Sequence, residues 1–109
     1  MDILTIKINQ YFNMSKKVIS VNTIIQRNSN ILTSDLDGEK VMMSIKRGEY
    51  FGLGKVGSFI WDNIENPTSI NELINNITQT YAIDKQTCFN EIKPFIADLL
   101  EKELISATY

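Results

Sequence analysis

The chain has 109 residues, of which 43% are hydrophobic, and a formal net charge of −2. This length and composition predict a single small globular domain with one core. Because nucleic-acid binders draw much of their affinity from a basic surface, the negative charge argues against DNA or RNA as a partner.

The residue types exclude several classes of enzyme. The chain has no histidine and one cysteine, Cys88, so a single chain cannot form a disulfide, a thiolate zinc site, a Ser-His-Asp triad or a Cys-His pair. We therefore expect no catalytic residues, no metal and no cofactor. The sequence also lacks an apolar run of about 18 residues and a signal-peptide pattern, which predicts a cytoplasmic protein that does not bind membranes.

The N-terminal part of the chain is less regular than the rest. Residues 1–17 have mixed character and contain a second methionine, Met14. We expect residues 1–17 to be an N-terminal extension, compatible with disorder, and residues 18–109 to form the domain. The β-branched run Val18–Arg27 favours an extended segment, either a strand or an arm lying on the domain.

A β-hairpin is predicted next. Two strand-like runs, Ile31–Leu36 and Lys40–Ile45, flank the dipeptide Asp37-Gly38, which tolerates the positive φ angles of a tight hairpin turn.

A third strand follows after a second turn at residues 46–49. In the run Tyr50–Leu53, alternate residues face opposite sides of the strand. Three sequential antiparallel strands result, and the outer edge of the third strand is left unpaired. An unpaired edge can accept another strand, and a homodimer formed through it is left open.

Two helices are predicted after the strands. Apolar residues recur at helical spacing from Lys55 to Ile64, and the pattern stops before Pro67. Ser69 and Glu72 form a capping box at the start of the second helix.

The third helix is predicted to begin after Asp84, whose side chain can cap it. Its Pro94 removes one N–H group, so we expect a bend between Asn90 and Pro94. The element order β-β-β-α-α-α therefore predicts an α+β fold of winged-helix type, a three-stranded antiparallel sheet followed by three helices.

Three glycines have the spacing of a dinucleotide-binding fingerprint, Gly52-x-Gly54-x-x-Gly57. The fingerprint requires a βαβ unit and a free acidic residue about 20 positions on. We expect no strand after the first helix, and Glu72 already belongs to the capping box. The spacing is therefore interpreted as a strand-to-helix junction, in which Gly52 lets a backbone or a ligand approach closely.

Two further functional interpretations are weaker. A winged helix could bind DNA through its last helix, but acidic residues balance the basic residues of that helix. Cys88 could be a nucleophile, but no histidine can activate it, and a free cysteine on an apolar helix face usually behaves as a small hydrophobe.

Several motifs resemble the PqqD-like family, over roughly Val18 to Ile105. They are the hairpin LDGEKVMMSI, the junction Y-F-G-L-x-x-V-G-x-x-I-W from Tyr50 to Trp61, a capped middle helix, and a last helix ending in LLEKELI. The resemblance implies a non-catalytic recognition element that binds the leader segment of a ribosomally made precursor peptide. It also implies delivery of the leader to tailoring enzymes, and a free-standing copy resembles those that serve the leader peptidase and cyclase of lasso-peptide pathways.

The resemblance also implies a binding site. In the family the leader lies as an added antiparallel strand on the third strand, and its side chains enter a groove beside the third helix. Carried over by position, the peptide-binding residues are those of the strand and those of the helix: Tyr50, Phe51, Gly52, Leu53, Cys88, Glu91, Ile92 and Phe95.

Overall fold

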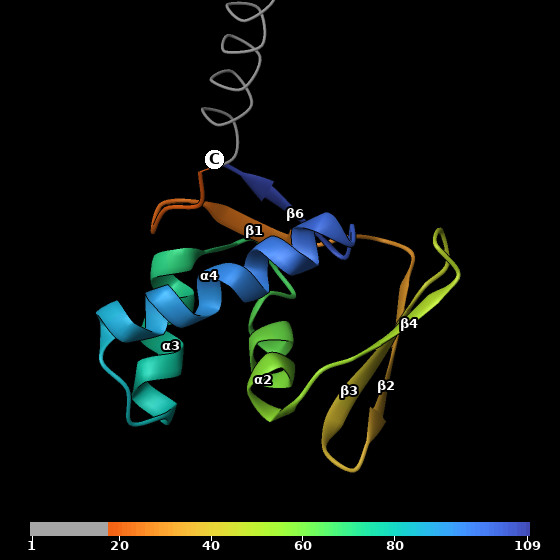
Figure 1. The fold of residues 1–109 in the computed structure, drawn as a ribbon, viewed down its shortest axis with the longest axis horizontal. Helices are drawn as coiled ribbons and strands as arrows, with labels where there is room; N and C mark the ends of the chain where they lie inside the picture. Colours follow the sequence, from red (N-terminus) through yellow and green to blue (C-terminus); the bar gives the residue numbers. More distant parts are fainter. Residues whose placement is uncertain (1–17) are drawn as a thin grey trace, which may run out of the picture.

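The strands of the protein form two antiparallel sheets of three strands each (Figure 1). The computed structural model describes residues 18–109, so the predictions for residues 1–17 lie outside the described residues. One sheet has the order β2-β3-β4, with bounds Ile31–Leu36, Glu39–Ser44 and Glu49–Gly52. The other has the order β5-β1-β6, with bounds Thr68–Ser69, Ile24–Arg27 and Ile105–Thr108.

The first sheet is the predicted meander. Leu36 pairs with Glu39, and the two residues between them, Asp37 and Gly38, have φ angles of 54° and 84°. Two successive positive φ angles are the geometry that matches the right-handed twist of a hairpin. The α+β, winged-helix-like fold is confirmed, with the three helices following this sheet.

The second sheet was only partly predicted. The extended segment expected from Val18 to Arg27 contains the strand β1, which pairs with β5 on one side and with β6 on the other. Neither partner was predicted, because β5 has two residues and β6 follows the last helix. The expectation that no strand follows the first helix is therefore wrong, although β5 pairs with β1 and not with β4.

The helices are α2 (Lys55–Asn63), α3 (Ile70–Thr80) and α4 (Lys85–Glu101). The Ser69 hydroxyl accepts a hydrogen bond from the Glu72 N–H at 3.1 Å, and Asp84 accepts one from the Thr87 N–H at 2.9 Å. Both N-cap hydrogen bonds are therefore formed, whereas the reciprocal bond of the predicted capping box, from the Ser69 N–H to the Glu72 carboxylate, is not found. The helix α4 is continuous through Pro94. Within residues 18–109, no helix is long and apolar enough to cross a membrane.

The core lies among the three helices and the inner faces of both sheets. Trp61 of α2, Leu73 of α3 and Ile96 of α4 are almost wholly buried, together with Ile25 of β1 and Met42 of β3. In Figure 1 the sheet β2-β3-β4 stands beside α2 and α4, at the opposite end of the molecule from α3. The sheet's position next to α4 creates the candidate site.

Candidate functional site

Among residues 18–109, the strand β4 is an end strand, and its backbone has no partner strand on the side away from β3. The Leu53 N–H donates to the Lys40 carbonyl at 2.9 Å, and the register pairs Phe51 with Met42. Backbone groups of successive residues point to opposite sides of a strand. The N–H and C=O groups of Tyr50 and Gly52 therefore point away from β3, and four hydrogen-bonding groups face the open edge.

A groove of about 300 Å³ lies between β4 and α4. Its lining combines apolar residues from the strand and the helix with the charged residues Asp98 and Lys102. The residues are Tyr50, Phe51, Gly52, Leu53, Phe95, Asp98, Leu99, Lys102 and Leu104.

Two contacts shape the helix wall of this groove. A Cβ atom at Gly57 of α2 would lie 3.1 Å from the Phe95 ring, so glycine lets α2 pack close to Phe95. The Lys102 ammonium lies 5.8 Å from the centre of the Phe51 ring and 2.5 Å from an Asp98 carboxylate oxygen. The cation therefore bridges the strand and the helix.

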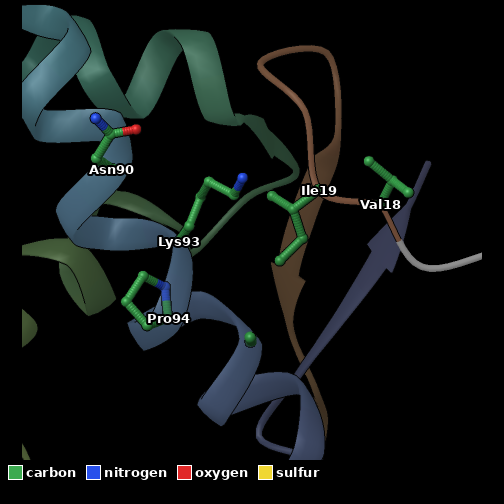
Figure 2. A pocket seen from close by; sticks show the side chains of 6 residues that line it. Val18, Ile19, Asn90, Lys93 and Pro94 are labelled. Carbon is green, nitrogen blue, oxygen red and sulfur yellow. The ribbon is translucent and has the colours of Figure 1, made fainter. Parts of the chain in front are cut away.

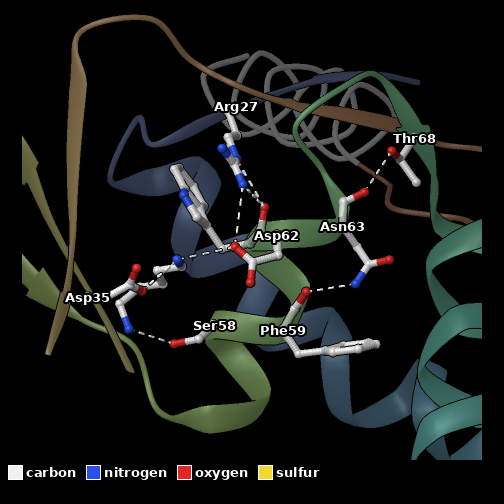
Figure 3. A network of polar contacts seen from close by, with 9 residues as sticks. Arg27, Asp35, Ser58, Phe59, Asp62, Asn63 and Thr68 are labelled. Atoms are coloured by element: carbon white, nitrogen blue, oxygen red, sulfur yellow. Dashed lines mark hydrogen bonds and ion pairs between the residues drawn. The ribbon is translucent and has the colours of Figure 1, made fainter. Parts of the chain in front are cut away.

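One end of β4 is fastened to α2. The Ser58 hydroxyl accepts from the Lys40 N–H at 2.8 Å and donates to the Leu53 carbonyl at 3.2 Å. Figure 3 shows Ser58 within a larger network, in which the Lys40 ammonium lies 2.6 Å from Asp35 and 3.6 Å from Asp62. The hydrogen bond that the Lys40 ammonium donates to Asp35, with the Asp62 carboxylate nearby, raises the pKa of Lys40 above its usual value.

The other end of β4 is fastened to the end of α4. Arg47, in the turn before β4, donates to a Glu49 carboxylate oxygen at 2.6 Å and to the Glu101 carbonyl at 3.2 Å. Lys46 in the same turn lies 3.2 Å from Glu103. Both ends of the edge strand are thus held in place beside α4, which leaves a preformed edge.

The structure places the predicted site residues in two groups. Tyr50, Phe51, Gly52, Leu53 and Phe95 line the groove together. The other three predicted residues do not line it.

Of those three, Cys88 is fully buried, Ile92 is 6% exposed, and Glu91 is exposed on α4. Burial, with the carboxylates of Glu91 and Asp84 nearby, raises the pKa of the Cys88 thiol. The contact of Cys88, Glu91 and Ile92 with a bound peptide stays a prediction. The position of these residues away from the groove does not support it.

The helix residues that line the groove lie further along α4 than predicted. Asp98, Leu99 and Lys102 follow Phe95 at helical spacing. The spacing could have identified these residues, since positions three, four and seven after Phe95 share its side of the helix.

The three spaced glycines do not form a nucleotide site. Gly54 is the N-cap of α2 and Gly57 packs against Phe95. The strand after α2 is antiparallel to β1 and lies in the other sheet from β4, so the βαβ unit that the fingerprint requires is not formed by these elements. Within residues 18–109, no group of three or more potential metal ligands is found.

A larger hollow of about 450 Å³ lies elsewhere on α4 (Figure 2). Its lining includes Val18, Ile19, Asn90, Lys93 and Pro94, and it shares no residue with the groove. Because proline has no N–H, the Asn90 carbonyl lacks its usual helical donor there. Size alone would favour this hollow, but none of the residues that line it belongs to a strand, whereas the smaller groove is lined by Tyr50, Phe51 and Gly52 of β4.

Comparisons with known proteins agree with this geometry. The family model described as "Coenzyme PQQ synthesis protein D (PqqD)" matches residues 39–105. No curated protein matches the chain.

Two solved structures are similar to the chain. "TbiB1 in Complex with the TbiA(beta) Leader Peptide" has 30% sequence identity and a TM-score of 0.70, over 74% of this chain and 94% of that chain. "Lasso peptide synthetase B1 complexed with the leader peptide" has 17% identity and a TM-score of 0.67, over 75% of this chain and 96% of that one, and shows a shared fold. On the family match and the 30% identity, and as the resemblance predicted, the chain belongs to the PqqD family.

Proposed function

We propose that this protein binds the leader segment of a ribosomally synthesised precursor peptide as an added strand on β4. The observation that carries the proposal is the open edge of Tyr50 and Gly52, which faces a groove walled by α4. Strand addition supplies affinity through backbone hydrogen bonds and specificity through pockets for alternate side chains. The family is one of non-catalytic peptide-binding proteins, which agrees with a function in recognition.

The two similar solved structures support the same proposal. Each is a complex with a leader peptide. We further propose that the bound leader is delivered to a leader peptidase and a cyclase of a lasso-peptide pathway. The support for this finer assignment is the likeness to a lasso peptide synthetase B1.

The backbone edge alone cannot give a useful affinity. Four hydrogen bonds at a net ~1 kcal/mol each supply ~4 kcal/mol, whereas a micromolar complex requires ~8 kcal/mol. The remainder must come from leader side chains that pack in the groove against Phe51, Leu53 and Phe95. We expect a dissociation constant between roughly 0.01 and 10 μM.

The test is an amide NMR titration with the leader of the precursor peptide encoded beside this chain. We expect the largest shifts at residues 49–54 and at Phe95, Asp98 and Lys102, and none with a scrambled leader. If the leader does not bind, the proposed function is wrong. Binding that leaves residues 49–54 unperturbed would place the peptide elsewhere.

A matched pair of substitutions tests the groove. Phe95→Ala removes an apolar wall of the groove, worth ~2 kcal/mol or about 30-fold in affinity. Phe59→Ala is the control, because Phe59 packs against Tyr81 with ring centres 5.5 Å apart and does not line the groove. We expect Phe95→Ala to weaken leader binding and Phe59→Ala to leave it unchanged. Equal affinities of the two variants would show that the groove is not used.

A further inference from the structure

Within residues 18–109, the structure provides no reason for glycine at position 52. The φ angle of Gly52 is not in the positive region, and a Cβ atom built there would meet no atom within 4 Å. A glycine inside a strand is less favourable than alanine, because it loses more backbone entropy on folding and offers no side chain to pack. The missing side chain therefore points to something outside the free domain.

The neighbours of Gly52 define the space that it leaves. Gly52 pairs with Val41 of β3, and Tyr50, two residues earlier, pairs with Met43. Because side chains alternate along a strand, a side chain at 52 would share the outer face of the sheet with Tyr50. Tyr50 is 73% exposed, and a shallow apolar hollow of about 150 Å³ on the sheet includes Val41, Met43 and Tyr50. Because Gly52 has no side chain, a notch remains on the outer face of the sheet, beside Val41 and at the unpaired edge of β4.

The backbone direction at Gly52 brings a docked strand next to this notch. The N–H and C=O groups of Gly52 point to the open edge, so an added antiparallel strand would form a hydrogen-bonded pair with it. The side chain of the paired residue would stand on the outer face, beside the place where Gly52 has no Cβ. Large side chains on one strand characteristically cover a glycine on the next.

We propose that Gly52 is a specificity-determining residue, which selects leaders carrying a bulky apolar side chain at the position paired with it. That side chain lies across the notch and contacts Tyr50 and Val41. The residues before and after it point to the other side of the strand, toward Phe51 and Leu53 in the groove. The inference rests on the proposed leader binding. It adds which position of the leader the protein recognises on the outer face of the sheet.

The test compares Gly52→Val and Gly52→Ala with the control Gly54→Ser. Gly54 is also without contacts at its Cβ position, and serine is a favoured N-cap for α2. The probe is the leader of the precursor encoded beside this chain, with the TbiA(beta) leader peptide as a second probe. Dissociation constants are measured by calorimetry, and thermal midpoints are measured for each free variant.

We expect Gly52→Val to bind the leader at least 10-fold more weakly than the wild type, and Gly52→Ala to bind with an intermediate affinity. Gly54→Ser should bind within twofold of the wild type. The thermal midpoint of Gly52→Val should not fall, because valine favours a strand. Binding of Gly52→Val within twofold of the wild type overturns the inference, as does an equal loss in Gly54→Ser.

An alanine scan of the leader completes the test. With the wild-type protein, alanine at one outward-facing leader position should lower the affinity at least 10-fold. With Gly52→Val, the same alanine substitution should lower the affinity less than threefold. A loss that is the same in both proteins would show that no leader side chain uses the notch. If no leader binds the wild-type protein, the proposed function itself fails, which is distinguishable from leader binding that ignores residue 52.

Discussion

A proline at position 50 should separate leader binding from folding. The Tyr50 N–H points away from β3 to the open edge, so its removal costs the sheet no hydrogen bond. Proline is tolerated in edge strands when the missing N–H faces away from the sheet. The residue before a proline prefers extended backbone, and Glu49 is already in a strand.

In Tyr50→Pro, the free energy of leader binding should fall considerably more than the free energy of unfolding of the free domain. A docked leader loses one hydrogen bond worth ~1 kcal/mol net, and its carbonyl is left without a donor at a cost of ~1–3 kcal/mol. The sum is ~2–4 kcal/mol, which corresponds to a rise of about 30-fold to 1,000-fold in the dissociation constant of Tyr50→Pro. Calorimetry with the leader peptide measures this change, and denaturant unfolding measures the stability of the free variant.

Two control variants sharpen the assay. Tyr50→Thr removes the aromatic ring but keeps the N–H, so it isolates the contribution of the ring. Phe51→Pro removes an N–H that points toward Met42 of β3, so it should destabilise the domain itself. If Tyr50→Pro binds the leader as well as Tyr50→Thr does, or if Phe51→Pro is as stable as Tyr50→Pro, the assigned direction of the β4 backbone is wrong.

Three further predictions concern α4. Pro94→Ala should raise the unfolding free energy by about 2 kcal/mol, because removing a helix-interior proline gains ~3 kcal/mol and the freer unfolded chain returns up to ~1 kcal/mol; unchanged denaturant stability would mean that α4 accommodates Pro94 without strain. The Cys88 thiol should react with a thiol reagent at pH 8 far more slowly in the native protein than in denaturant, since it is buried and its pKa is raised; equal rates would contradict its burial. Hydrogen bonds from the Thr87 N–H and hydroxyl lower the pKa of Asp84, so its contribution to stability is present above its usual pKa of about 4 and is lost as the pH falls through the lower native value. Asp84→Ala should therefore lose less stability than the wild type between pH 5 and pH 2 in denaturant unfolding, and parallel curves would contradict the capping contact.

The features that the sequence predicted well depend on neighbouring residues. The turn at Asp37-Gly38 requires two positive φ angles, and both residues adopt them. The caps at Ser69 and Asp84 are formed by hydrogen bonds to residues three positions on. The open edge of β4 follows from the order of three sequential strands.

The features that the sequence did not predict depend on residues far apart in the chain. The strand β1 pairs with Thr68–Ser69 and with Ile105–Thr108, and no local pattern specifies either partner. A two-residue strand such as β5 is too short to show an alternating pattern.

The candidate site likewise has one part that the sequence predicted and one part that it did not. By itself the sequence determined the strand half of the groove, because the order of three strands leaves the edge of β4 unpaired and the family resemblance, carried over by position, indicates Tyr50–Leu53. Only the tertiary structure decided which turn of α4 lies beside that strand, since one continuous apolar stripe covers both the core and the groove. In the folded chain α4 packs mainly against α3 and β6, Cys88 and Ile92 are buried, and Asp98, Leu99 and Lys102 lie at the groove, because helical periodicity fixes a face and not the position along the helix where a neighbouring strand lies.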